Sequence, residues 1–135
     1  MRVVIDTNIL LQAIANKSRM RPIWNAYLEE HFDLIVSASI LLEYEEKIAE
    51  KTSHVVALNV VSLINEAVNS VFINIYFNWH IILADPDDNK FLDAAITGNA
   101  DYIVTNDAHF NAAKKINFPK VNIISSEEFL DLLTN

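Results

Sequence analysis

The sequence predicts an α/β fold of three layers, in which helices cover both faces of a mostly parallel sheet. Two observations carry this prediction. Short runs of β-branched and aliphatic residues alternate along the chain with longer segments that place their apolar residues at helical spacing. In addition, 52% of the 135 residues are hydrophobic, which is enough to build a core. We therefore expect one domain over residues 1–135.

The first elements follow from short apolar runs and their flanking residues. Residues 2–5 (RVVI) predict a short buried strand, and residues 8–16 predict a helix because their apolar side chains fall on one face. Pro22 suits the first turn of a second helix at 22–31. The run LIVS at 34–37 then predicts a second strand.

The middle of the chain is expected to be helical and then irregular. Ser37 or Ser39 would cap a helix that continues to about residue 50. Residues 53–70 contain few charges and many Val, Leu and Ala, so we expect a well-buried helix there. Residues 73–83 have no clear periodicity and are expected to be partly extended.

The last third of the chain returns to a regular alternation. Residues 85–98 (DPDDNKFLDAAITG) predict a helix with Asp85 as its cap, Pro86 in its first turn and Gly98 at its end. The remaining elements are a strand at 102–105, a helix at 107–115, a strand at 121–124 and a helix at 126–133. Helices between successive strands predict parallel pairing.

Composition excludes several classes of protein. There is no run of 18 apolar residues, so no membrane span is expected. The absence of cysteine excludes disulfides and thiolate metal sites, and it agrees with a reducing cytoplasm. A net charge of −8 argues mildly against a nucleic-acid partner. Acids gathered around a metal ion would weaken that argument, because the ion cancels their charge.

Two apolar strands end next to an aspartate. Asp6 follows the strand at 2–5, and Asp107 follows the strand at 102–105. Ligands of open α/β sheets bind beyond the carboxyl ends of the strands, so both acids should open onto one crevice if these strands are neighbours. Each aspartate alone could simply cap the helix that follows it.

The segment 85–98 offers further acids. Asp85 and Asp87 suit a helix N-terminus. On a helical wheel Asp88 lies within the apolar face, whereas Asp93 lies toward the polar side. An inward carboxylate is costly unless something pairs with it, and a metal ion would. We therefore favour a ligand role for Asp88 over that of a plain first-turn acid, and the reverse for Asp93.

The segment 37–51 (SASILLEYEEKIAEK) carries several acids on its predicted helix. Glu43 and Glu45 flank the apolar stripe on opposite sides. The geometry of the helix does not choose between them, and an acidic solvated face would explain both.

Four blocks of this chain occur together: VIDTNIL at 4–10, ILLEY at 40–44, DPDDNKFLDAA at 85–95 and ADYIVTND at 100–107. In their order and approximate spacing they resemble PIN-domain proteins, the nuclease fold of many bacterial and archaeal VapC-like toxins. The blocks span nearly the whole chain, which makes the resemblance much more specific than the DTN motif alone.

The resemblance implies four acids around one or two Mg²⁺ or Mn²⁺ ions, and these would be the catalytic residues Asp6, Glu43, Asp88 and Asp107. It selects Glu43 over Glu45. Asn8 and Thr105 match small polar positions that orient the first acid or touch a phosphate. Asp93 would be an alternative ligand or a partner that supports a ligand.

The activity that the resemblance implies is hydrolysis of RNA phosphodiester bonds by the toxin of a toxin–antitoxin pair. The metal ion would lower the pKa of a bound water near neutral pH and offset the charge that builds on the phosphoryl oxygens. A cognate antitoxin protein would block the site, and the toxin would form a cytoplasmic homodimer to which residues 53–82 contribute. One departure is that basic residues near the expected site are sparse.

Two alternative functions compete with this interpretation. A catalytically inactive PIN-like module would bind nucleic acid or protein without cutting it. A haloacid-dehalogenase phosphatase needs a second aspartate where Asn8 stands, which argues against that class. His109 follows Asp107 by two residues and could approach the crevice, but the role of an ordinary helix residue is favoured. Trp24, Phe77 and Trp79 could stack on bases, but packing is the favoured role.

Overall fold

The computed structural model describes residues 1–76, 78–82, 86–116 and 120–134. Two residues named above, Phe77 and the expected cap Asp85, lie outside the described residues.

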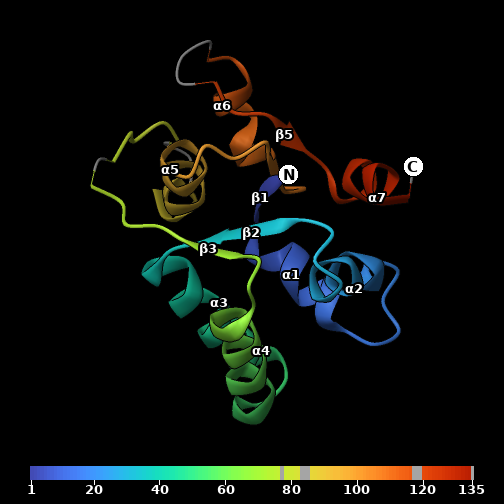
Figure 1. Cartoon of the computed structure of the whole chain (residues 1–135). Coiled ribbons are helices and arrows are strands. Elements are labelled where there is room, and N and C mark those ends of the chain that lie inside the picture. Colours follow the sequence, from blue (N-terminus) through green and yellow to red (C-terminus); the bar gives the residue numbers. More distant parts are fainter. Residues whose placement is uncertain (77, 83–85, 117–119, 135) are drawn as a thin grey trace.

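A five-stranded sheet forms the centre of the molecule (Figure 1). Its strands are β1 (Arg2–Ile5), β2 (Asp33–Val36), β3 (Ser70–Phe72), β4 (Tyr102–Val104) and β5 (Ile123–Ile124), in the spatial order β3-β2-β1-β4-β5. All four pairings between neighbours are parallel. In the middle of the sheet, Val3 of β1 pairs with Leu34 on one side and with Tyr102 on the other. The predicted parallel sheet is confirmed.

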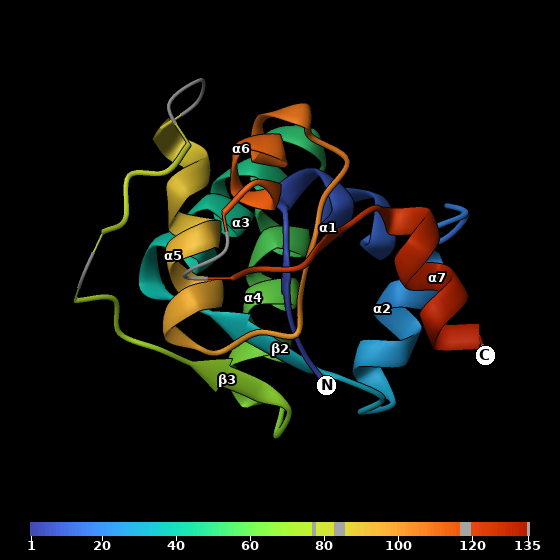
Figure 2. The ribbon, with the colours of Figure 1, turned by 90° about the horizontal axis from the view of Figure 1, so that it is seen from above.

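Helices lie on both sides of this sheet. They are α1 (Thr7–Ile14), α2 (Arg21–Leu28), α3 (Ala38–Lys51), α4 (His54–Glu66), α5 (Asn89–Thr97), α6 (Asn111–Lys114) and α7 (Ser126–Thr134). Figure 1 shows α1, α3 and α4 on one side of β2 and α5 on the other, which confirms the three layers. Figure 2 shows α7 beside α2, the helix that it contacts. Within the described part of the chain, no helix has the length and apolar character needed to cross a bilayer.

The elements before residue 52 agree with the sequence prediction. Pro22 lies in the first turn of α2, where its missing N–H costs nothing. Of the two serines considered as a cap for α3, Ser37 takes this role, because its hydroxyl oxygen accepts a hydrogen bond of 3.3 Å from the N–H of Ile40.

The prediction of a well-buried helix over residues 53–70 is wrong in two respects. The helix α4 ends at Glu66, and the chain then forms strand β3 at the edge of the sheet. Moreover, α4 buries a stripe that includes Ala57 and Ile64, but it leaves Val55 67% exposed and Leu58 57% exposed. Apolar composition alone did not reveal this exposure, because it does not say which faces of a helix find a partner.

The elements after β3 are shorter than the sequence suggested. Described residues of the segment 73–83 form no helix or strand. A 3-10 turn at Pro86–Asp88 precedes α5, so Asp88 lies at the start of this helix and not within its first turn. The predicted helix at 107–115 divides into a 3-10 turn at Ala108–Phe110 and the short α6.

Gly98 ends α5 as predicted, and its lack of a side chain lets the helix end approach the sheet closely. A Cβ atom at this position would lie 3.0 Å from the carbonyl oxygen of Ala94 and 3.0 Å from Cδ1 of Ile35 on β2. The start of the same helix, with Asp88, lies near Asp107 and His109, which follow β4.

Candidate active site

The order of the strands creates a switch point between β1 and β4. From β1 the chain adds β2 and β3 on one side, and it then returns to add β4 and β5 on the other. Ligands of doubly wound sheets bind at the carboxyl ends of strands at such a point. Asp6 follows β1 directly, and its N–H donates a 3.0 Å hydrogen bond to the carbonyl oxygen of Val104 on β4. The expectation that Asp6 and Asp107 open onto the same edge is therefore confirmed.

A threonine links the two aspartates. The hydroxyl of Thr105 donates a hydrogen bond of 2.8 Å to Oδ2 of Asp6. The same oxygen of Thr105 accepts a hydrogen bond of 3.0 Å from the N–H of Asp107. Thr105 is buried, so this relay holds Asp6 and the backbone of Asp107 in fixed positions relative to each other.

Asp6 lies in an environment that disfavours its charge. The residue is only 6% exposed, and this burial raises the pKa of its carboxyl group. The hydrogen bond from Thr105 lowers that pKa in part, while the negative charges of Asp107 and Glu43 raise it further. A cation among these carboxylates would reverse the effect of the neighbouring charges.

The two aspartates line a cleft of about 430 Å³. The other lining residues are Asn8, Ile9, Leu11, Gln12 and Asn106, so the cleft combines amide groups with an apolar wall from α1. Asn8, a candidate from the sequence, therefore lines the same cleft as Asp6 and Asp107.

Glu43 reaches toward this edge from α3. Its carboxylate accepts a hydrogen bond from the hydroxyl of Thr7, the residue that follows Asp6. Its other oxygen lies 2.5 Å from Nζ of Lys90 on α5, and both side chains are largely shielded from solvent. Glu43 is thus held between α1 and α5, close enough for its charge to raise the pKa of Asp6.

Asp88 lies at the start of α5, where a histidine contacts its carboxylate. Nδ1 of His109 lies 3.5 Å from Oδ2 of Asp88 and 3.3 Å from Oδ1 of Asp107. One ligand atom from each of these three residues lies within 4.8 Å of the other two. Asp88 is buried, as the helical wheel suggested, even though it precedes α5.

Asp93 is placed differently from the expectation. The wheel assigned it to the polar side of its helix, but it is only 2% exposed, so that assignment is wrong. Its Oδ1 accepts a hydrogen bond of 3.0 Å from the N–H of Trp79, and burial raises its pKa. Asp93 lines a second hollow of about 560 Å³ together with Lys90, and it is not among the residues that line the cleft at Asp6.

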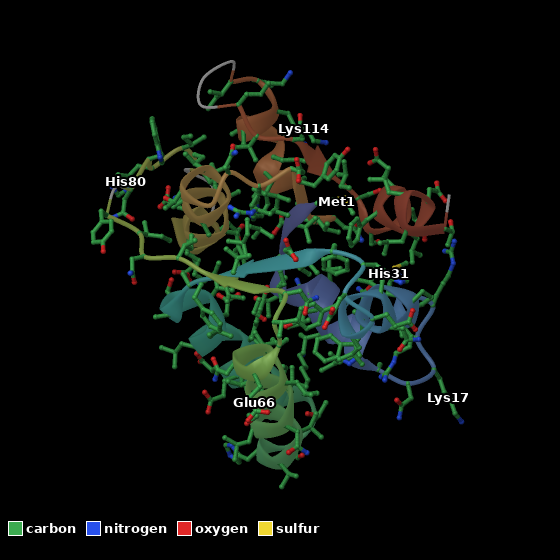
Figure 3. The ribbon with its side chains drawn as sticks, in the orientation of Figure 1. Met1, Lys17, His31, Glu66, His80 and Lys114 are labelled. Carbon is green, nitrogen blue, oxygen red and sulfur yellow. The ribbon has the colours of Figure 1, made fainter. Side chains whose placement is uncertain are left out.

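Two residues at this site were not predicted. Basic residues were expected to be sparse here and His109 to be an ordinary helix residue, yet Lys90 and His109 both contact carboxylates. Figure 3 labels another basic residue, Lys17, at the periphery of the molecule, far from α5 and α6. Of the tryptophans considered for base stacking, Trp24 is buried in the core.

Because burial raises the pKa of Asp6, the metal-free protein should lose stability as pH rises from the ordinary aspartate pKa to the raised one. Over this range the folded state holds the proton that the unfolded state has released. Asp6→Asn removes this loss and can still accept the hydrogen bond from Thr105. The variant should therefore gain stability relative to wild type as pH rises toward neutral, in urea unfolding with EDTA. A difference between the two proteins that does not change with pH would contradict this assignment.

Comparison with known proteins agrees with this architecture. The family model described as PIN domain matches residues 2–109. VapBC2 from Rickettsia felis, solved bound to a DNA fragment from their promoter, aligns with a TM-score of 0.63 and 15% identity over 93% of this chain and 98% of that chain. VapBC-1 from nontypeable Haemophilus influenzae aligns with a TM-score of 0.60 and 16% identity over 94% and 99% of the two chains.

A third solved structure, FitAcB from Neisseria gonorrhoeae, aligns with a TM-score of 0.56 and 13% identity over 93% of this chain and 98% of that chain. No curated protein matches the sequence. At these identities the solved structures establish similarity of fold alone, whereas the family match runs from β1 to His109 and covers most of the chain. The chain therefore belongs to the PIN domain family.

Proposed function

We propose that this protein is a cytoplasmic, metal-dependent endoribonuclease that acts as the toxin of a toxin–antitoxin pair. The observation that carries the proposal is the convergence of Asp6 and Asp107 on one cleft at the switch point of the sheet. Membership in the PIN domain family supports the same activity, because PIN domains are generally nucleases.

The chemistry of these side chains fits a hard divalent cation. Mg²⁺ and Mn²⁺ prefer carboxylate oxygens, and the cleft presents them beside a buried aspartate whose pKa is raised by burial and by two neighbouring negative charges. We assign Asp6, Asp88, Asp107 and Glu43 as the residues that would hold one or two such ions. A bound cation would polarise a phosphoryl oxygen and lower the pKa of water.

The other residues of the cleft would bind and orient the RNA backbone. The amides of Asn8, Gln12 and Asn106 line the cleft and can donate hydrogen bonds to phosphate oxygens. Ile9 and Leu11 line the same cleft and would limit the access of water. Thr105 would keep Asp6 in the position that the reaction needs, through its hydrogen bond to that carboxylate.

We also propose an antitoxin protein as a partner and a homodimer as the functional state. The similarity of fold to VapBC2, VapBC-1 and FitAcB supports a protein partner. Exposed apolar side chains on α3 and α4, which include Leu42, Val55 and Leu58, offer a surface for either contact.

Cleavage of a panel of single-stranded and structured RNAs, including tRNA, tests the activity. Wild-type protein should cut at least one RNA with Mg²⁺ or Mn²⁺ and lose this activity in EDTA. Asp6→Asn should cut at least about 100-fold more slowly. Glu46→Gln, which alters an exposed acid on α3, should cut like wild type and controls for the loss of one acid away from the cleft. Asp6→Asn, purified in the same way, controls for contaminating ribonucleases. Equal cutting by Asp6→Asn would refute the proposal, and metal binding without cutting would favour a non-catalytic PIN-like module.

A further inference from the structure

A histidine lies among the carboxylates of the proposed metal centre. His109 follows Asp107 by two residues, and its N–H donates a hydrogen bond of 2.9 Å to Oδ1 of Asp107. Its ring nitrogen Nδ1 lies 3.3 Å from that same oxygen and 3.5 Å from Oδ2 of Asp88. The ring therefore lies beside both carboxylates, while 44% of the side chain stays exposed to solvent.

These separations suit three atoms that share one ion. Ligand atoms of an octahedral ion lie about 2.1 Å from the metal and about 3 Å from one another. The two contacts of Nδ1 are only slightly longer than this, and the three residues offer ligand atoms within 4.8 Å of one another. A small contraction around a cation would bring nitrogen and both carboxylate oxygens into its coordination sphere.

We infer that His109 supplies a nitrogen ligand to the cation held by Asp88 and Asp107, and that it thereby favours a divalent transition metal such as Mn²⁺ or Co²⁺ over Mg²⁺. The inference rests on the proposed metal centre. Mg²⁺ is a hard cation that takes oxygen ligands, whereas imidazole is a good ligand for transition metals. Affinity for a given nitrogen and oxygen site rises from Mn²⁺ to Co²⁺, so the contribution of His109 should be larger for Co²⁺.

The competing explanation is that His109 only forms ion pairs with the two aspartates and never contacts the metal. Two substitutions separate these roles. His109→Ala removes the ring nitrogen. His109→Asn replaces it with an amide oxygen near the position of Nδ1, and this oxygen can bind Mg²⁺. His54→Ala, at the exposed start of α4, is the matched control.

The test measures the affinities of wild type and the three variants for Mg²⁺, Mn²⁺ and Co²⁺ by isothermal titration calorimetry. His109→Ala should weaken Co²⁺ binding by about 10-fold or more and Mn²⁺ binding by less. His109→Asn should leave Mg²⁺ affinity within about twofold of wild type. His54→Ala should change none of the three affinities.

Electron spin-echo envelope modulation of the Mn²⁺ complex detects nitrogen bound directly to the metal. A purely structural role of His109 would not change this signal. Coupling of the Mn²⁺ electron spin to a directly bound ¹⁴N should be present in wild type and His54→Ala and absent in His109→Ala. A wild-type complex without this coupling, or coupling that persists in His109→Ala, would overturn the inference while the nuclease proposal stands on its cleavage data. Failure of all three metals to bind would overturn both.

Discussion

Replacing Asp107 with Asn is expected to lower the rate of RNA cleavage by about 10³-fold, whereas Asp93→Asn should leave the rate within about twofold of wild type. Asp107 lines the cleft with Asp6, and its carboxylate also lies beside His109. In the proposed metal centre, Asp107 would therefore join Asp6 of the cleft to the group formed by Asp88 and His109. The carboxylate of Asp93 instead accepts a hydrogen bond from the N–H of Trp79. Asp93 lines the second hollow and not the cleft that contains Asp6 and Asp107.

The Asn side chain makes Asp107→Asn a mild change for the fold. Its amide oxygen can still accept the hydrogen bond from the N–H of His109. The backbone N–H of residue 107 can still donate to the hydroxyl of Thr105, because that bond does not use the side chain of residue 107. The loss of activity should therefore occur with little change in melting temperature. It should also be accompanied by weaker Mn²⁺ binding, because one negative charge is lost from the site.

Single-turnover cleavage of the RNA found in the panel experiment, with saturating Mn²⁺, measures this prediction for both variants. Melting temperatures in EDTA serve as the control for folding. If Asp93→Asn slowed cleavage as much as Asp107→Asn, Asp93 would have to be placed among the metal ligands. If Asp107→Asn cut at the wild-type rate, the cleft at the ends of β1 and β4 would not be the catalytic site.

The meeting of Asp6 and Asp107 was predictable because it depends on two local patterns and one general rule. Each aspartate closes a short apolar strand, and parallel strands present their carboxyl ends at the same edge of a sheet. The sequence did not by itself establish that β1 and β4 are neighbours. That adjacency arises because the chain reverses the direction in which it adds strands after β3.

Asp93 and α4 show where periodicity misleads. The helical wheel compares residues of one helix and cannot include a segment that packs over it from elsewhere. The backbone at Trp79 contacts Asp93 on α5. The segment around Trp79 has no regular apolar periodicity, so the sequence did not predict this contact. For α4 the error is opposite, since apolar residues such as Leu58 were assumed to be covered and are exposed.

His109 and Lys90 could not be assigned from the sequence, because their contacts join distant elements. Lys90 on α5 meets Glu43 on α3, and His109 meets Asp88 across the edge of the sheet. Such pairs depend on how closely α5 packs on the sheet, a distance that no local pattern encodes. The available signal was weak: each residue lies within two positions of a candidate ligand.

Asn89→Ala is expected to lower the free energy of unfolding by about 2–4 kcal/mol, because it removes two hydrogen bonds to the buried backbone of Ile82. Nδ2 of Asn89 donates to the carbonyl oxygen of Ile82, and Oδ1 accepts from the N–H of Ile82, both at 2.8 Å. Asn89 and Ile82 are both buried, so water cannot readily replace either bond. Urea unfolding in EDTA measures the loss, which would be a large part of the stability of an ordinary domain.

Asn122→Ala is the matched control, because Asn122 is exposed and donates one hydrogen bond, of 3.2 Å, to the carbonyl oxygen of Asp101. It should cost no more than about 1 kcal/mol. Asn89 lies between Asp88 and Lys90 at the start of α5, so the same substitution should also weaken Mn²⁺ binding, by loosening both neighbours. Equal losses of stability in the two variants would show that the contacts of Asn89 with Ile82 do not anchor α5. A loss confined to Asn89→Ala would establish that the segment before α5 holds the start of this helix, with Asp88, in place.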